Sequence, residues 1–188
     1  MKVKYLGTKG TWRDIANACR TTVSMGEGEG EPSSSWKKRM LLAEHSPIRK
    51  MRLEWKWEDL KYWVSVHMVR HKIGITHFVS SQRSDRGKPN TKNRDGAPQS
   101  TPVLHECEAN FQSIINISRK RLCNQAHQET KAAWKLFLDE IVKPNEPELY
   151  EICVPECVYR GKCYEYEKCG FEGSKEYFKL KIDYDRVE

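Results

Sequence analysis

The sequence predicts an α+β fold in which several helices pack against a small, mostly antiparallel sheet. Stretches of alternating polar and apolar residues lie near the start, in the first third and near the end of the chain. Segments with apolar residues at helical spacing separate them. A chain of 188 residues with 38% hydrophobic residues can bury a core, and it has no internal repeat. We therefore expect one domain over residues 1–188, with a cysteine-rich segment at about 150–188.

The first 50 residues contain signals for one strand and two helices. Residues 2–6 alternate in polarity as a short strand does, and residues 11–20 have helical spacing. Residues 26–35 are almost entirely Gly, Glu and Ser, which predicts a mobile loop. A helix is expected over 36–45, because the residue before Pro47 disfavours helical conformation.

The rest of the chain shows similar local patterns. Met51 to Trp57 alternates as a half-buried strand, and Glu58 and Asp59 place favourable charges in the first turn of a following helix. Further elements are expected in order: a loop at 86–102, a helix or helix pair at 103–130, a helix at 131–142 and a strand at 178–184.

Charge and cysteine content limit the classes of partner. The formal charge of +7 favours anionic ligands, which include nucleotides, nucleotide cofactors and nucleic acid. No apolar run is long enough to cross a membrane, and the first residues lack an apolar stretch of secretory length. Seven cysteines, an odd number, then suit a reduced, cytoplasmic chain.

The segment from Arg70 to Arg86 is dense in cations, histidines and hydroxyls. It begins with Arg70-His71-Lys72 at the end of a short helix, where His67 shares a face with Arg70 and His71. Arginine forks, a lysine charge and hydroxyls suit phosphate and carbonyl oxygens, so we interpret the segment as a nucleotide-phosphate site. The alternative is a solvated basic turn.

A second group lies on the expected helix at 103–130. Asn110 and Arg121 are 11 residues apart, close to three turns, and Gln125 follows Arg121 by one turn; Asn116 lies between them. A buried arginine needs an acceptor, which could be a ligand carbonyl or phosphate. It could also be Glu129 in an ordinary intrahelical or tertiary ion pair, which this group taken alone favours.

The cysteine-rich segment offers a third group. Four thiols fall within 17 residues at Cys153, Cys157, Cys163 and Cys169. They could bind a zinc ion or, with more difficulty, an iron–sulfur cluster. The alternative is a set of reduced structural cysteines, because the spacing is wider than that of a zinc knuckle.

In this order along the chain, the groups resemble the flavin-dependent thymidylate synthase (ThyX) family over about residues 15–145. Arg70-His71-Lys72 resembles the opening of the family's signature, and Ser81-Gln82-Arg83 resembles its end; counting residues would place the signature serine at Ser80 instead. The remaining resemblances are Thr22-Val23-Ser24, His45-Ser46-Pro47, Arg94 with Pro98, and the Asn110, Asn116 and Arg121 helix.

The resemblance implies a ThyX-like fold and reductive methylation of dUMP to dTMP, a step of nucleotide biosynthesis. FAD would be the cofactor, with NADPH and methylenetetrahydrofolate as co-substrates, in a homotetramer with shared active sites. Arg121 would act on the uracil in catalysis. The substrate would be held by Arg70, Ser81, Gln82, Arg83, Arg94 and Arg121. The flavin would be held by Ser24, His45, Ser46, Arg70, His71, Lys72, Asn110, Asn116 and Gln125.

Two other functions are compatible with these residues. A diverged flavoenzyme on the same scaffold could act on another pyrimidine nucleotide. Alternatively, a non-catalytic relative could bind nucleic acid or a protein through the basic strings from Arg83 to Arg94 and at Arg119-Lys120-Arg121.

Overall fold

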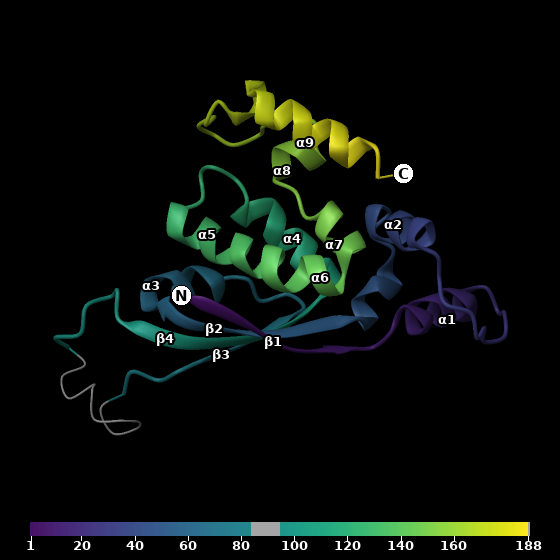
Figure 1. Ribbon diagram of the computed structural model, residues 1–188, viewed down its shortest axis with the longest axis horizontal. Helices are drawn as coiled ribbons and strands as arrows, with labels where there is room; N and C mark the ends of the chain where they lie inside the picture. Colours follow the sequence, from purple (N-terminus) through teal and green to yellow (C-terminus); the bar gives the residue numbers. More distant parts are fainter. Residues whose placement is uncertain (84–94, 188) are drawn as a thin grey trace.

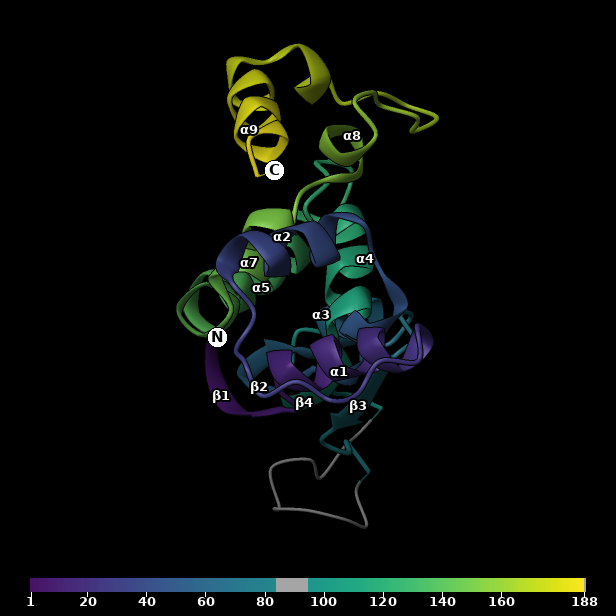
Figure 2. The ribbon, with the colours of Figure 1, turned by 90° about the vertical axis from the view of Figure 1, so that its right-hand side faces the viewer.

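The chain folds around a four-stranded sheet. In this computed structural model, residues 1–83 and 95–187 are described. The strand order is β1 (Lys2–Lys9), β2 (Arg52–Lys61), β4 (Pro102–Asn110) and β3 (Ile75–Val79), and all three pairings are antiparallel. Helices α3 to α7 lie over one face of the sheet, and α8 and α9 form the part farthest from it (Figures 1 and 2). This arrangement confirms the predicted α+β class.

Helical segments make up most of the remaining described chain. They are α1 (Trp12–Thr22), α2 (Ser34–Leu42), η1 (Ser46–Lys50), α3 (Tyr62–Met68), α4 (Phe111–Arg121), α5 (Gln128–Phe137), the π-helical turn η3 (Leu138–Val142), α6 (Lys143–Asn145), α7 (Pro147–Ile152), α8 (Glu156–Tyr159), η4 (Phe171–Gly173) and α9 (Lys175–Asp185). In the described residues, none of these helices combines the length and apolarity needed to cross a bilayer.

The main core lies between the sheet and the helices. Trp55 and Trp57 of β2 are fully buried, and the Trp55 ring stacks on Phe137 of α5 with centroids 4.0 Å apart. Trp134 adds a third buried indole to this cluster, and its Nε1 donates to Ser118 Oγ at 2.9 Å. The core therefore fixes α4 and α5 against the middle of the sheet.

Several predicted elements are confirmed, with shifted ends. The strand at 2–6, the helices at 11–20 and 36–45, and the strand at 51–57 all form. The helix predicted at 131–142 also forms, as α5 followed by η3. The helix start at Glu58 and Asp59 is wrong: β2 continues through both residues. Asp59 has a φ of +56° at a break in the β2–β4 register, and the helix begins three residues later at Tyr62.

The helix predicted over 103–130 is wrong in its first part, because residues 102–110 form β4. Val103, His105, Cys107 and Ala109 are buried at every second position. His105 is polar and Cys107 is only weakly apolar, so the sequence does not show a clear alternation of polar and apolar residues here. The prediction also missed β3, a short strand that pairs only with β4.

The strand predicted at 178–184 is also wrong, because this segment lies in α9. Tyr177 is buried, and Leu180 and Tyr184 pack against buried clusters at helical spacing. Phe178 and Ile182, which the strand interpretation would bury, are 57% and 49% exposed. Helical spacing therefore decides which aromatic residues reach the core.

Candidate functional site

Arg121 and the Arg70-His71-Lys72 segment meet where α3 ends. Arg121 is the last residue of α4, and β4 leads directly into that helix. Its Nε donates to His71 Nε2 at 2.8 Å, and a terminal nitrogen donates to the His67 carbonyl at 2.6 Å. Two groups that are 50 residues apart in sequence therefore form one site.

His71 is a neutral partner for this arginine. Burial, with the charge of Arg121 as a second cause, lowers the pKa of His71 to about 4. Because Nε2 accepts from Arg121, the neutral ring carries its proton on Nδ1. The contact orients the guanidinium at neutral pH, but a neutral imidazole does not neutralise its positive charge.

No described carboxylate pairs with Arg121 or Arg70. The alternative partner considered for Arg121, Glu129, pairs with Lys61 at 2.8 Å, so that interpretation is wrong. Burial, followed by the charge of Arg70, lowers the pKa of Arg121. Within the described part of the chain, two of the five N–H donors of Arg121 make hydrogen bonds. The site can therefore accept an anionic or carbonyl ligand.

A tight turn joins this site to the start of α4. Asn110 caps the helix: its side-chain Oδ1 accepts from the Ser113 backbone N–H at 2.9 Å. Its backbone N–H donates to the Gly74 carbonyl at 2.9 Å. Ser113 Oγ donates to the Ile73 carbonyl at 2.7 Å. Asn110, a predicted flavin residue, thus has an observed structural role as a cap.

The predicted phosphate residues follow this turn along the chain. Lys72 and Ser81 are exposed, Gln82 is partly buried, and the Arg83 amide donates to Ser81 Oγ at 3.2 Å. Ser80 Oγ instead accepts from the Leu104 amide at 3.0 Å, next to β4. Ser80 and Ser81 are both exposed, and each hydroxyl accepts one backbone hydrogen bond. Arg94 lies outside the described residues.

A polar network stands beside His45. Glu44 accepts from Arg119 and Gln112, and Gln112 also donates to Asn116 Oδ1 at 3.3 Å. Burial opposes ionisation of Glu44, but the hydrogen bonds from Arg119 and Gln112 outweigh it and hold the pKa of Glu44 below its usual range. The network ties Glu44, in the turn between α2 and exposed His45, to the middle of α4.

A cavity of about 660 Å³ opens between α1, α2 and the chain that joins them. Arg20, Trp36 and His45 contribute to its lining. Ser24 lies between two lining residues with a φ of +58°, and Ser46 follows His45; both are exposed. A guanidinium (Arg20), an indole (Trp36) and an imidazole (His45) therefore line the same cavity.

Gln125 does not share a helix face with Arg121, so this part of the prediction is wrong. α4 ends at Arg121, and Gln125 lies in the loop before α5. Its amide nitrogen donates to the Glu167 carbonyl at 2.6 Å. The observed role of Gln125 is a contact with the C-terminal segment.

The four predicted cysteines do not form one group. Cys153 is buried in the main core, where burial raises its pKa to about 12. Cys157, Cys163 and Cys169 line a cavity near the C-terminus, and their fourth neighbour is Cys123, from the loop after α4. No local pattern pointed to Cys123, which is 34 residues before Cys157.

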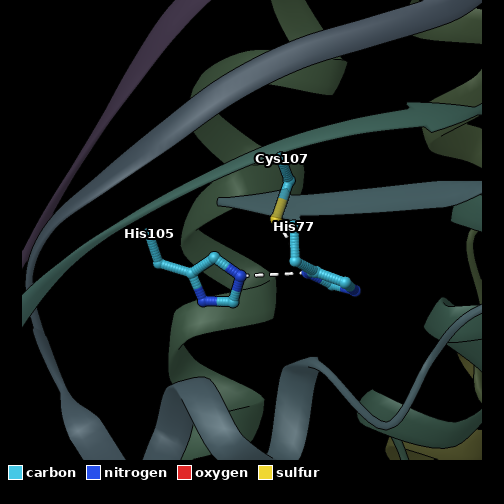
Figure 3. A group of neighbouring side chains, drawn as sticks. All are labelled: His77, His105 and Cys107. Carbon is cyan, nitrogen blue, oxygen red and sulfur yellow. Dashed lines mark hydrogen bonds between the residues drawn. The ribbon is translucent and has the colours of Figure 1, made fainter. Parts of the chain in front are cut away.

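His77, His105 and Cys107 form one group of side chains, in which His77 is partly buried and the other two are buried (Figure 3). His77 comes from β3, and the other two come from the neighbouring strand β4. His77 Nε2 donates to the His71 carbonyl at 2.8 Å, so the group contacts the backbone of the Arg121 site. The His-x-Cys spacing on a strand could have indicated it, but the sequence pattern favours a helix over residues 105–107.

Comparison with known proteins identifies the fold. The chain matches no protein-family model, and no curated protein sequence is significantly similar to it. Its structure is similar to flavin-dependent thymidylate synthase ThyX from Helicobacter pylori, solved with FAD and dUMP in two crystal structures. The TM-scores are 0.65 and 0.66 at 15% identity, over 82% of this chain and 100% and 99% of those chains.

A related enzyme gives a similar result. The UMP/dUMP methylase PolB from Streptomyces cacaoi, solved with 5-Br dUMP, matches with a TM-score of 0.61 and 12% identity, over 80% of this chain and 93% of that one. The chain therefore has the fold of flavin-dependent thymidylate synthases, as the resemblance implied.

Proposed function

We propose that this protein is a flavin-dependent thymidylate synthase. It would convert dUMP to dTMP with methylenetetrahydrofolate as the carbon donor and with FAD that NADPH reduces. The observation that carries the proposal is Arg121. It is a partly buried cation with no carboxylate partner among the described residues, on a fold that it shares with enzymes solved with FAD and dUMP.

Arg121 would act on the uracil ring. A guanidinium fork can donate two parallel hydrogen bonds to the O2 and N3 edge of a pyrimidine. Negative charge that develops on this edge during methylation would be stabilised by a donor that is already oriented. The contacts to His71 and the His67 carbonyl supply that orientation.

The nucleotide phosphate and sugar would be held next to this arginine. We assign this role to Arg70, Ser81, Gln82, Arg83 and Arg94. Support comes from the exposed Arg70 and Ser81 side chains. A phosphate would also balance part of the positive charge around Arg70 and Arg121.

The chemistry that bound, reduced FAD would supply is the hydride transfer that completes the methyl group. The residues proposed to hold FAD are Ser24, His45, Ser46, Arg70, His71, Lys72, Asn110, Asn116 and Gln125. The cavity beside His45 offers Trp36 for ring stacking and Arg20 for a phosphate, so its residues fit part of a dinucleotide. Support is strongest for His45 and Asn116, which are both exposed: His45 follows Glu44 in the sequence, and Asn116 accepts from Gln112 in the Glu44 network.

The working form would be a cytoplasmic homotetramer with active sites shared between subunits. Ile73 directly follows Lys72, Phe78 lies on the edge strand β3, and the two side chains are 88% and 59% exposed. Exposed apolar side chains at a site suit contact with another subunit. Light scattering of the purified protein measures this directly, and a monomer at micromolar concentration would contradict it.

The proposal predicts that the purified protein binds FAD and makes dTMP. The protein should show flavin absorbance after incubation with FAD and gel filtration. With NADPH, methylenetetrahydrofolate and dUMP it should then form dTMP, and omission of any one component should stop the reaction. A folded protein that takes up no flavin would contradict the proposal.

A methylase that prefers UMP is the second candidate, and it is favoured by the structural likeness to the UMP/dUMP methylase. UMP differs from dUMP by a 2′-hydroxyl, so the two candidates make opposite predictions in one competition assay. A larger kcat/KM for UMP than for dUMP would support the second candidate.

A further inference from the structure

Three metal-binding side chains converge between β3 and β4. His77 Nδ1 lies 2.9 Å from His105 Nε2 and 3.2 Å from Cys107 Sγ (Figure 3). Among the described residues this is the group whose possible ligand atoms all lie within 4.8 Å of one another. His105 and Cys107 are 0% and 1% exposed, so the donors meet in the interior.

Hydrogen bonding alone leaves this group unsatisfied. His77 Nε2 faces the His71 carbonyl and must carry the proton, so Nδ1 offers one lone pair. His105 Nε2 and Cys107 Sγ both approach that lone pair. His105 Nδ1 is buried and has no hydrogen-bond partner in the structure. Neutral side chains therefore place two candidate donors on one acceptor and leave another polar atom unpaired.

A metal ion would resolve the competition for the His77 Nδ1 lone pair, because His77 Nδ1, His105 Nε2 and the Cys107 sulfur would each bind the ion; His105 Nδ1 would keep its proton and is not a ligand. Ligand histidines typically donate their other ring N–H to a backbone carbonyl, as His77 does to His71. With Zn–N bonds of about 2.0–2.1 Å and a Zn–S bond of about 2.3 Å, tetrahedral angles separate two nitrogens by about 3.3 Å and a nitrogen from the sulfur by about 3.6 Å. The observed separations are only a few tenths of an ångström shorter, so small side-chain rotations suffice.

We propose that His77, His105 and Cys107 bind a zinc ion. The ligands would be His77 Nδ1, His105 Nε2 and the Cys107 thiolate, with water or another group in the fourth position. The ion would clamp β3 to β4. Through His77 and the His71 carbonyl it would also stiffen the turn that presents His71 to Arg121. This site does not depend on the proposed reaction.

Zinc analysis of variants tests the site. Protein purified without chelator and loaded with Zn²⁺ should lose about one equivalent when His105→Gln or Cys107→Ser is introduced. Cys19→Ser is the matched control, since Cys19 is a partly buried thiol on α1, and it should keep the full zinc content. A full zinc content in folded His105→Gln and Cys107→Ser would overturn the proposal and leave a hydrogen-bonded network.

A spectroscopic measurement covers the case in which these core variants do not fold. X-ray absorption at the zinc edge of the folded Cys163→Ser protein should show imidazole nitrogen together with sulfur. Cobalt substituted into the same protein should show a thiolate charge-transfer band. Bound zinc with no imidazole ligand, or no bound zinc at all, would refute the site.

An independent observation concerns the C-terminal cysteines. Cys123, Cys157, Cys163 and Cys169 are reduced and line one cavity of about 440 Å³. The region around it has its own small core of Val154, Cys157, Val158, Cys163 and Tyr177. Five buried side chains are a small local core, and a disulfide or a metal is a common way to reinforce such a core.

We infer that these four cysteines form a second, structural zinc site. The cavity brings together three cysteines from the segment around α8 and one from the loop after α4, so a tetrahedral site of four thiolates would staple that segment to the main domain. The sulfurs are less tightly grouped than the donors around His77, so binding would draw the lining loops together.

Substitution of single cysteines tests this second site. Cys163→Ser and Cys169→Ser should each remove about one equivalent of zinc and speed proteolysis between residues 160 and 185. Cys153→Ser is the matched control, because it changes a neighbouring cysteine outside the cavity. Unchanged zinc content and unchanged proteolysis in both cavity variants would refute the site; should they fail to fold, wild-type zinc surrounded by imidazole without a majority of sulfur would refute it.

Discussion

Replacing Arg121 with alanine is expected to lower kcat/KM for dTMP formation by at least about 10²–10³-fold, on the scale of the effect of removing an oriented oxyanion donor. The guanidinium is the charged group proposed to contact the uracil, and no other described cation hydrogen-bonds His71. Steady-state kinetics measures the loss. Circular dichroism, light scattering and flavin absorbance should remain those of the wild type, because Arg121 is not one of the buried residues of the main hydrophobic core.

Two variants separate this role from a general effect of charge. Lys120→Ala removes the preceding cation of α4, which is exposed and lies 3.6 Å from Glu156, and kcat/KM should change by less than about twofold. Arg121→Lys keeps the charge but loses the planar fork, so it should restore only a small part of the activity. Equal losses in Lys120→Ala and Arg121→Ala, or wild-type turnover in Arg121→Ala, would exclude the proposed contact.

Replacing Gly74 with alanine is expected to destabilise the protein by about 2–4 kcal/mol. Gly74 has a φ of +68°, which alanine adopts only with strain. An added Cβ would also stand 2.2 Å from Ser113 Oγ and 2.4 Å from Asn110 Nδ2. These two side chains form the cap of α4, so they cannot move away without losing hydrogen bonds. Urea denaturation at fixed protein concentration measures the change in the free energy of unfolding.

Gly161→Ala is the matched control. Gly161 has a similar φ of +71°, but the nearest atom to an added Cβ is Lys181 Cε at 3.8 Å, an ordinary contact. Backbone strain alone should therefore cost about 1 kcal/mol there. If the two alanine variants lose the same stability, the crowding between Gly74, Asn110 and Ser113 does not contribute.

The elements that could be predicted from the sequence are those with a clear local period. Trp55 and Trp57 alternate with charged residues, and the same alternation puts both indoles into the core. β4 obeys the same rule, yet its inward residues include His105 and Cys107, so its pattern does not look apolar. Around Phe178 and Ile182 the alternation is clear but misleading, because the helix α9 leaves both exposed. The period of apolar residues alone does not show which face of a strand or helix other elements will bury.

For the candidate site too, the sequence indicated the residue types and the tertiary structure decided their partners. The residue types of Arg70, His71 and Arg121 indicated an anionic ligand, since these chemistries are encoded in single side chains. Only the tertiary structure brought Arg121 against His71 and paired Glu129 of α5 with Lys61 of β2. Whether Glu129 pairs with Arg121 depends on the distance between them in space, and the number of residues between them does not give that distance.

By itself, the sequence determined the α+β class, the early elements and the chemical character of the site. These properties follow from side-chain chemistry and from periods of about two or 3.6 residues, which act over short stretches. Tertiary structure alone decided that β4 is a strand between β2 and β3, that Cys123 rather than Cys153 joins the other cysteines, and that His77 meets His105 and Cys107. Each of these depends on contacts between residues far apart in the chain, and such contacts form only when the sheet and helices bury their common core.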